Sequence, residues 1–411
     1  MSESARTRRF WDTQCCVVGG GPAGMMLGYL LARTGVEVTV LEKHGDFFRD
    51  FRGDTIHPAT TEVMAELGLL EEFLLLPHTE MPELRIGIDG QTFTLVDFRH
   101  LPTRCKFVAF MPQWDFLNFL AAKAKEYPTF QLNMGTEVTA LIQQGNRVVG
   151  VRACSPRGEV EVRAKLTVAC DGRFSAVREC AGLPVREFDM PIDVLWFRLP
   201  HGQDAPPALG YLGGGQIVVT IDRGDYWQCG TIIEKGTFER VQAEGLDAFR
   251  GRLVQAAPFL HTVVDELTSW EQVKLLSVRT DRLDRWYQPG LLCIGDAAHA
   301  MSPAGAVGVN YAIADAVATA NQLAARLYKG EVEIADLDRV QRRREPAVRR
   351  AQAVQRRQTS QLVRLTQSAP PLRVIRLLSR LPLAKQLLGR VIGLGFRPEH
   401  IRTPHLLKGC N

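Results

Sequence analysis

The pattern of apolar and polar residues divides the chain into segments with the period of a helix and segments typical of strands. An apolar strand over 15–18 leads into a glycine-rich turn and then into a helical run over 25–33, and a second apolar strand follows over 36–41. Strand, helix and strand in this order predict a parallel sheet of the doubly wound α/β class. From residue 312 onward the pattern is helical, which predicts a helical C-terminal region.

Two intervening stretches alternate with the period of a strand instead. The first covers 83–107, with a turn expected at Asp89-Gly90, and the second covers 192–279. Within the second stretch we expect strands over 194–198, 216–220 and 226–233. This alternation predicts a mostly antiparallel sheet. The two stretches that form it are inserted at separate points into the sequence of the doubly wound domain.

The glycine-rich turn predicts a dinucleotide-binding site. Gly19, Gly21 and Gly24 stand between strand and helix in Gly-x-Gly-x-x-Gly order, which permits a tight turn, a close backbone approach to a pyrophosphate and close helix packing. The N-terminus of the helix adds unpaired N–H groups and a positive dipole. Glu42 ends the second strand, where a carboxylate can bind both adenosine ribose hydroxyls and disfavours the 2′-phosphate of NADP.

Two further motifs, one before the middle of the chain and one late in it, each follow an apolar strand. Asp171-Gly172 comes after the strand at 166–170, and Gly295-Asp296-Ala-Ala-His299 comes after the strand at 292–294. Asp296 therefore stands where the carboxyl end of a strand meets a ligand crevice. A spaced loop continues from it with Pro303, Gly305, Gly308 and Asn310. The glycine-rich turn and the Gly295-Asp296 motif lie nearly the whole chain apart. This separation implies that the two motifs hold the same cofactor.

The composition fits a soluble enzyme with a large core. The 411 residues suffice for two or three domains, and 45% of them are hydrophobic. The nine cysteines form no Cys-x-x-Cys pair and no metal-type spacing, so we expect no metal site, no disulfide framework and a reducing, cytoplasmic compartment. We also expect no signal peptide and no membrane span, because the start is polar and no apolar run reaches about 18 residues.

The net charge of +5 is mild but unevenly placed. Between 339 and 357, arginines recur at 342, 349 and 356 and at 343, 350 and 357, interrupted by Pro346. Such a run is typical of the solvated face of a bracing helix. The alternative is a weak contact with an anionic membrane surface or an acidic partner, which the arginine-rich apolar segment 372–396 favours. Nucleic acid is not expected, because no aromatic residues interleave with the arginines.

In the order and spacing of its motifs the chain resembles the group A flavoprotein monooxygenases, the para-hydroxybenzoate hydroxylase-like family, over about residues 13–330. The resemblance implies FAD as cofactor, NAD(P)H as a transient electron donor and O2 as co-substrate. It further implies hydroxylation of an aromatic or other electron-rich hydrophobic small molecule through a flavin C4a-hydroperoxide. The chain has no second Gly-x-Gly-x-x-Gly motif, which fits a donor without a domain of its own.

The resemblance also assigns residues to the cofactor. It implies that Arg52 reaches the pyrophosphate, that Gln113 lies near the ribityl chain and that Val138 offers a backbone contact to adenine. Asp171 and Gly172 match a motif linked to both FAD and NAD(P)H. The full set of expected FAD-binding residues is Gly19, Gly21, Pro22, Ala23, Gly24, Glu42, Lys43, Arg52, Gln113, Val138, Asp171, Gly172, Asp296, Pro303, Gly308, Val309 and Asn310.

The loop at 303–310 departs from the family pattern, because Ala306-Val307 replaces the usual Gly-Gln. We therefore expect this loop to act through its backbone N–H groups beside the flavin ring. The expected domains are an FAD-binding domain over 1–82, 108–188 and 280–330, a substrate domain over 83–107 and 189–279, and a helical region over 331–411.

Other candidate residues and functions stay open at this point. His299 is a structural hydrogen-bonder or a catalytic group, and Asp54 and His57 order the flavin or line a channel. No catalytic residue is assigned, and none of Trp196, Tyr211, Tyr226 and Trp227 is assigned to the substrate, because alternation sends half of such side chains to the far face. Alternative functions are a reductase of the geranylgeranyl-reductase type and a non-catalytic flavin module. The lack of Trp-x-Trp argues against a flavin halogenase.

Overall fold

The computed structural model describes residues 9–48, 55–201, 208–367 and 372–405. Its first sheet has eight strands, of which five are parallel neighbours built from the apolar segments. The expected strand at 36–41 is shorter than the pattern predicts and begins at Val38. The parallel strands are, in spatial order, β20 (Leu291–Cys293), β11 (Gly158–Ala169), β1 (Arg9–Val18), β2 (Val38–Leu41) and β8 (Phe130–Asn133).

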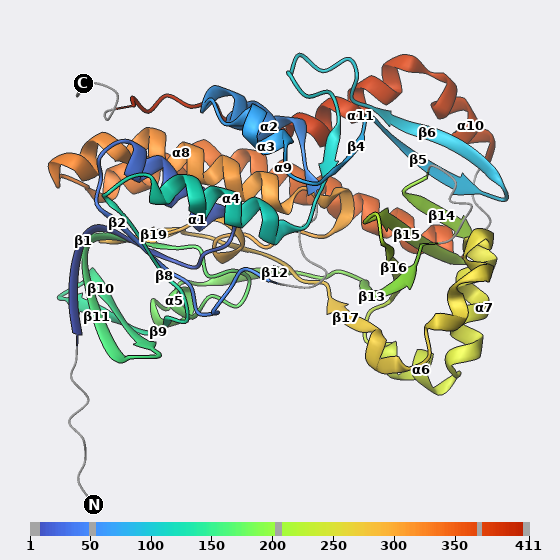
Figure 1. The fold of residues 1–411 in the computed structure, drawn as a ribbon, viewed down its shortest axis with the longest axis horizontal. Helices are drawn as coiled ribbons and strands as arrows, with labels where there is room; N and C mark the ends of the chain where they lie inside the picture. The colour runs from blue at the N-terminus through green and yellow to red at the C-terminus, as the bar shows by residue number, and fades with distance from the viewer. Residues whose placement is uncertain (1–8, 49–54, 202–207, 368–371, 406–411) are drawn as a thin grey trace, which may run out of the picture.

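Antiparallel strands extend this sheet. β19 (Tyr287–Gln288) pairs with β20, and β9 (Glu137–Gln144) and β10 (Arg147–Ser155) continue from β11. The helices that pack with the parallel part are α1 (Pro22–Arg33), α4 (Gln113–Lys125) and α8 (Gly308–Lys329), with α1 between the other two (Figure 1). The side chains of β1, α1 and α8 form one continuous buried cluster. The fold is therefore the doubly wound α/β class that the sequence predicts.

A seven-stranded sheet is built from both alternating stretches of the sequence. In spatial order its strands are β17 (Lys274–Ser277), β13 (Ile192–Pro200), β16 (Tyr226–Glu234), β15 (Gln216–Asp222), β14 (Gly210–Gly213), β5 (Glu83–Ile88) and β6 (Gln91–Asp97). Every pair is antiparallel except β14 with β5. β5 and β6 are joined at the predicted turn, where Asp89 and Gly90 both have positive φ.

Helices cover one face of this sheet, and short elements join the two sheets. α6 (Phe238–Ala243) and α7 (Leu246–Ala256) carry side chains of the cluster on the covered face. Between the sheets lie two small sheets, β3 (Thr55–Ile56) with β7 (Val108–Phe110) and β4 (Thr79–Met81), and β12 (Val185–Phe188) with β18 (Thr280–Leu283). The remaining short helices are α2 (Pro58–Glu66), α3 (Leu70–Leu74) and α5 (Ala176–Cys180).

The C-terminal region begins with α9 (Ile334–Gln367), which packs along α8 and continues through Pro346. Pro346, which interrupts the run of arginines in the sequence, therefore does not end the helix. α10 (Leu372–Arg380) and α11 (Pro382–Leu394) then lie beside β6 at one end of the molecule (Figure 1).

The segment after α11 returns toward the first sheet. The Ile401 backbone N–H donates to Glu66 at 2.7 Å, and the Arg402 backbone N–H donates to Asn321 at 2.8 Å. No helix in the described part of the chain is long and apolar enough to cross a bilayer.

Candidate functional site

The parallel strands place the predicted motifs along one edge of the first sheet. Val18 is in register with Ala169 and with Leu41, and Ala169 is in register with Cys293. The strands therefore end side by side. In spatial order, the residues after them are Asp296 beyond β20, Asp171 beyond β11, the Gly19–Gly21 turn beyond β1 and Glu42 beyond β2. Motifs from four distant segments of sequence thus form one continuous edge.

The turn after β1 is packed so closely that its glycines are required. Gly19 has φ +103°, and an added Cβ would come within 2.4 Å of the Cys170 carbonyl oxygen. A Cβ on Gly24 would come within 1.9 Å of the Gly19 carbonyl oxygen. Gly21 differs from both, since no atom lies within 4 Å of its Cβ position. The N-terminal end of α1, with Pro22 and the buried Ala23, therefore faces open space beside Gly21.

Glu42 is a buried carboxylate that is held by backbone N–H groups. The Gly20 N–H donates to its Oε2 at 2.7 Å, and the His44 N–H donates to its Oε1 at 3.0 Å. The Glu42 carbonyl also accepts from Thr136 at 2.8 Å, which brings the segment before Val138 to the same corner. Val138 is buried, whereas the neighbouring Lys43 is exposed. An acid so oriented next to the glycine turn suits a ribose.

Asp171 holds its own turn together. Its carboxylate accepts from the Ser175 hydroxyl at 2.5 Å and from the Val177 backbone N–H at 3.1 Å. Burial raises the pKa of Asp171, and these hydrogen bonds offset the effect in part. Gly172 has φ +86° with no atom within 4 Å of its Cβ position. In this structure Asp171 fixes the turn, and the backbone at Gly172 is the open part.

Asp296 is the more accessible of the two strand-end aspartates. Its side chain is 32% exposed, and its Oδ2 lies 3.7 Å from the Arg173 guanidinium. The adjacent Arg178 is buried and donates to the Ala297 carbonyl at 3.3 Å, while its guanidinium pairs with Asp281. Arg173 and Arg178 follow Asp171 in the sequence. The Asp171-Gly172 motif and the Gly295-Asp296 motif are therefore in direct contact.

The loop at 303–310 meets β3 and α2. Thr55 donates its hydroxyl to the Ala306 carbonyl at 2.9 Å. Asn310 Oδ1 accepts from the His57 backbone N–H at 3.0 Å and from the Thr60 hydroxyl at 2.6 Å, whereas Asn310 Nδ2 is buried without a hydrogen-bond partner. Pro303 caps the short turn, Gly308 opens α8 and Val309 is buried in its first turn.

The remaining predicted residues lie on the same side or outside the described residues. Gln113 is half-buried at the start of α4, directly after β7, which pairs with β3. His57 is buried, and its Nδ1 donates to the Ile392 carbonyl at 2.9 Å. Arg52 and Asp54 lie outside the described residues.

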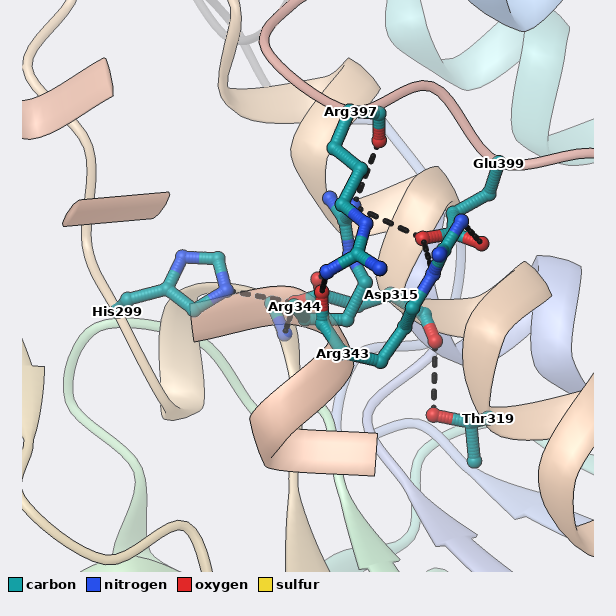
Figure 2. Close-up of polar contacts among 8 residues, drawn as sticks. His299, Asp315, Thr319, Arg343, Arg344, Arg397 and Glu399 are labelled. Atoms are coloured by element: carbon teal, nitrogen blue, oxygen red, sulfur yellow. Dashed lines mark hydrogen bonds and ion pairs between the residues drawn. The ribbon is translucent and has the colours of Figure 1, made fainter. Parts of the chain in front are cut away.

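His299 is buried and hydrogen-bonded to an aspartate of α8. Its Nε2 lies 2.6 Å from Asp315 Oδ2, and the same oxygen accepts from the Gly295 N–H at 3.0 Å. Asp315 Oδ1 accepts from Arg344 Nε at 2.9 Å (Figure 2). Burial alone would raise the pKa of Asp315, but the charges and hydrogen bonds of His299 and Arg344 outweigh it and hold the pKa below its ordinary value. Hydrogen bonds to Asp315 of α8 thus hold the motif at 295–299 in place.

The sequence motifs did not predict the contact of Asp315 with His299 and Arg344. Asp315 and Arg344 are fully or almost fully buried, and Arg344 also pairs with Glu399 at 3.3 Å. The available signal was an aspartate within the otherwise apolar segment 312–318 of a predicted helix. A buried carboxylate at such a position requires a cationic partner. The sequence does not identify that partner, because it comes from a distant helix.

The aromatic residues of the second sheet divide between its faces. Trp227 and Tyr211 belong to the cluster under α7, whereas Trp196 packs on the opposite face with Val219 and Phe110. A Cβ on Gly230 would lie 2.9 Å from the Trp196 ring, so this glycine leaves room for the indole. Trp196 therefore lies on the face that α7 leaves uncovered.

Comparisons with known proteins agree with this geometry. A family described as "FAD binding domain" matches residues 12–356. The 6-methylpretetramide 4-monooxygenase of Streptomyces rimosus is 33% identical over 386 residues, which cover 92% of each chain. A probable NADH-specific resorcinol 4-hydroxylase of Rhodococcus jostii is 28% identical over 342 residues, 81% of this chain and 62% of that protein. The fold matches that of the OxyS anhydrotetracycline hydroxylase of S. rimosus with a TM-score of 0.73 at 24% identity, over 93% of this chain and 76% of that one.

Fold, strand-end motifs and relatives together define an FAD-dependent oxidoreductase. The chain belongs to the FAD-binding-domain family and, within it, to the group A FAD-dependent aromatic monooxygenases. It is an FAD-dependent monooxygenase. The reductase alternative is not supported, because the named relatives are monooxygenases and hydroxylases. Within the described residues there is no cluster of His, Cys, Asp or Glu that could hold a metal ion.

Proposed function

We propose that FAD lies along the strand-end edge of the first sheet, with its pyrophosphate at the N-terminus of α1. The open space beside Gly21 and the close packing of Gly19 and Gly24 support this placement, because they let a phosphate approach the backbone. The adenosine ribose would bind Glu42, with Lys43 and Val138 at the same corner. Pro22 and Ala23 would form the floor of the pyrophosphate turn.

The other half of the cofactor would extend toward Asp296 and the N-terminus of α8. The buried and unpartnered Asn310 Nδ2 supports this, because such a donor is satisfied by a ligand or by water. Pro303, Gly308 and Val309 would present backbone atoms to the ring, and Gln113, Asp171 and Gly172 would line the middle. The bound cofactor supplies the redox chemistry that takes electrons from a nicotinamide and activates O2.

The chain itself would orient the cofactor and keep water from the reacting atoms. The N–H groups at the start of α8 point from a helix N-terminus, where a partial positive charge favours a reduced, anionic flavin. The second sheet would close the substrate site with the face that carries Trp196. We assign no side chain as an acid or base at the reacting carbon, since the bound cofactor would supply the redox chemistry.

We further propose NAD(P)H as the transient donor and an aromatic, hydrophobic small molecule as the substrate. The NADH-specific relative supports the donor, and the 33% identity to the monooxygenase of 6-methylpretetramide makes that compound the first candidate. A reducing cytoplasmic compartment fits the cysteines, of which the eight in the described part of the chain are free.

The test is the absorbance spectrum of the purified protein, followed by NADH and NADPH oxidation with and without O2 against a panel of aromatic compounds. We expect bound FAD, compound-stimulated oxidation that needs O2, and a product that gains one oxygen atom. Turnover without O2 would contradict this function.

Replacement of Asp296 tests the placement of the cofactor. Asp296→Ala should strip FAD from the purified protein, and Glu42→Gln should weaken FAD more modestly, because it keeps a ribose acceptor. The exposed Asp265→Ala is the matched control, with unchanged flavin content expected. Full flavin occupancy in Asp296→Ala would overturn the placement without affecting the assignment of the activity.

A further inference from the structure

The surface formed by α10 and α11 has a composition that the enzyme's chemistry does not explain. The described residues include fifteen large apolar side chains that are strongly exposed, and seven of them lie between 374 and 388. They are Val374, Leu377, Leu378, Leu381, Leu383, Leu387 and Leu388. We call these residues, with the arginines between them, the α10–α11 surface. Single exposed apolar residues are ordinary, but a contiguous cluster marks a binding surface.

α10 has apolar residues on two opposite sides. Leu372 and Ile375 pack against the second sheet, beside Phe93 and Leu212. Positions 374, 377, 378 and 381 follow the i, i+3, i+4, i+7 spacing of a second stripe, and all four are exposed. The packed side already supplies the contacts that hold the helix to the fold. The outer stripe therefore has no role in the core.

Two glycines of α11 lie close to the second sheet. A Cβ on Gly389 would lie 2.1 Å from the Asp97 carbonyl oxygen, and a Cβ on Gly393 would lie 2.7 Å from the Leu101 side chain. The backbone of the helix thus approaches β6 and its following loop closely at these glycines, and the side chains of Ile392 and Leu394 pack there as well. Leu383 and Leu387, on the other side of the helix, are 80% and 63% exposed.

The charge of this region identifies the kind of partner. Between Pro346 and Pro398 the sequence has eleven Lys and Arg residues and no Asp or Glu, although the whole chain has 45 acidic residues. Arg373, Arg380 and Arg390 are exposed beside the leucines. Two copies that met through this same surface would bring like charges together, whereas an anionic partner would neutralise them. Lipid headgroups offer negative charge with an apolar layer directly beneath it.

We propose that the α10–α11 surface binds the surface of an anionic lipid bilayer. The leucines enter the boundary between headgroups and acyl chains, and the arginines contact the lipid phosphates. Binding of this kind lies in the plane of the bilayer and needs no spanning helix. The inference goes beyond the monooxygenase activity and does not depend on which substrate the enzyme takes.

The first test is cosedimentation of the FAD-loaded full chain with vesicles. One set contains phosphatidylcholine alone, and the other contains phosphatidylcholine with phosphatidylglycerol. We expect binding to the anionic vesicles only, and weaker binding as salt shortens the range of the electrostatic attraction. Equal binding to both sets, or binding to neither, would overturn the proposal.

Variants separate the two parts of the surface. Leu377→Asn, Leu383→Asn and Leu387→Asn combined should lower vesicle affinity at least about tenfold, because three apolar side chains leave the interface. Leu75→Asn, at a strongly exposed leucine directly after α3, is the matched control. Arg373→Glu with Arg380→Glu should abolish the preference for anionic vesicles, whereas the exposed Arg157→Glu should not. An unchanged flavin spectrum in each variant verifies its fold.

A direct contact measurement and a competing partner complete the test. In Leu383→Trp, the added tryptophan fluorescence should be quenched by brominated lipids in anionic vesicles, which requires insertion at this position. A tryptophan that stays unquenched while the protein sediments with the vesicles would overturn the proposal. Soluble polyglutamate is the competing partner. If it binds as tightly as the vesicles do, and if the triple leucine variant keeps this binding, the proposal is overturned in favour of an acidic protein partner.

Discussion

Ala306 is held in a backbone conformation that alanine disfavours. Its φ is +52°, next to Gly305 at +77°, and the Thr55 hydroxyl binds its carbonyl oxygen at 2.9 Å. A left-handed residue with a Cβ carries strain of about 1–2 kcal/mol. Glycine is the family's usual residue in the middle of this loop, so the strain is a feature of this chain. It lies in the loop that we place beside the flavin.

Replacement of Ala306 by glycine should therefore stabilise the protein. Relief of the strain outweighs the added flexibility of the unfolded chain, which offsets about 0.5–1 kcal/mol, so the free energy of unfolding should rise by up to about 1 kcal/mol. Urea denaturation measures the change. Ala304→Gly, in the same loop without positive φ, is the control and should lower the stability. A lower stability for Ala306→Gly would contradict the strain argument.

His57 makes the stability depend on pH. Burial lowers its pKa from 6.5 to about 4, against hydrogen bonds to backbone carbonyls that raise it. The unfolded chain thus binds the proton more readily than the folded protein does. The contribution of neutral His57 to the free energy of unfolding is therefore fully present above pH 6.5 and is lost as the pH falls through 4. The loss is about 3 kcal/mol.

In His57→Gln the unfolding free energy should fall less between pH 7 and pH 4 than in the wild type, because glutamine keeps a donor for Ile392 but does not titrate. Denaturation series at several pH values measure the two slopes. The exposed His261→Gln should keep the wild-type slope. Parallel slopes for His57→Gln and wild type would show that His57 does not cause the pH dependence.

At the scale of elements, α11 depends on close contact between its backbone and β6. The absence of a side chain at Gly389 permits this contact, since a Cβ there would lie 2.1 Å from the Asp97 carbonyl oxygen. Asp97 also anchors the end of β6 through hydrogen bonds from Arg99, which lower the pKa of its carboxyl. The strand end cannot move freely to make room.

Gly389→Ala should destabilise the protein by about 2 kcal/mol, because the helix must shift away from the strand. Gly251→Ala in α7 is the matched control. Its Cβ position is open, so alanine should stabilise that helix by about 0.5–1 kcal/mol. Thermal unfolding of both variants measures the opposite signs. A neutral Gly389→Ala would mean that α11 is only loosely attached.

At the scale of the whole molecule, one buried set of charges joins three distant parts of the chain. Arg344 of α9 binds Asp315 of α8 and Glu399 of the returning C-terminal segment, and Arg343 binds Glu399 at 2.7 Å (Figure 2). Through His299 and Gly295 the same network reaches the loop that carries Asp296. The C-terminal segment is therefore coupled to the candidate cofactor site.

Glu399→Gln should lower the free energy of unfolding by about 2 kcal/mol, because the buried Arg344 and the partly buried Arg343 lose a charged acceptor. It should also weaken FAD binding, since the Asp315 anchor loosens. Glu331→Gln, at an exposed pair with 3.9 Å separation, should change stability by less than about 0.5 kcal/mol. Flavin titration and denaturation on the same samples check both effects. Loss of stability with unchanged FAD affinity would disprove the coupling.

The sequence alone determined the local frame of this protein. Apolar strands, the glycine turn and the Asp-Gly and Gly-Asp motifs are short-range patterns, and each requires its own backbone geometry whatever surrounds it. Gly19 and Gly24 meet the backbone contacts that this pattern predicts, and the Asp89-Gly90 turn has the expected positive φ values. The same patterns predicted the doubly wound sheet and the inserted antiparallel one.

Only the tertiary structure decided which distant residues meet. The burial of Asp315 with Arg344, the attachment of α11 through Gly389 and the outward side of α10 depend on packing between segments that are far apart in the chain. Periodicity shows that a helix has two faces but not which of them finds a partner. Charge runs are equally ambiguous, since Arg344 is buried and Arg342 in the same helix is exposed. Burial decides between these outcomes, and burial is a property of the whole fold.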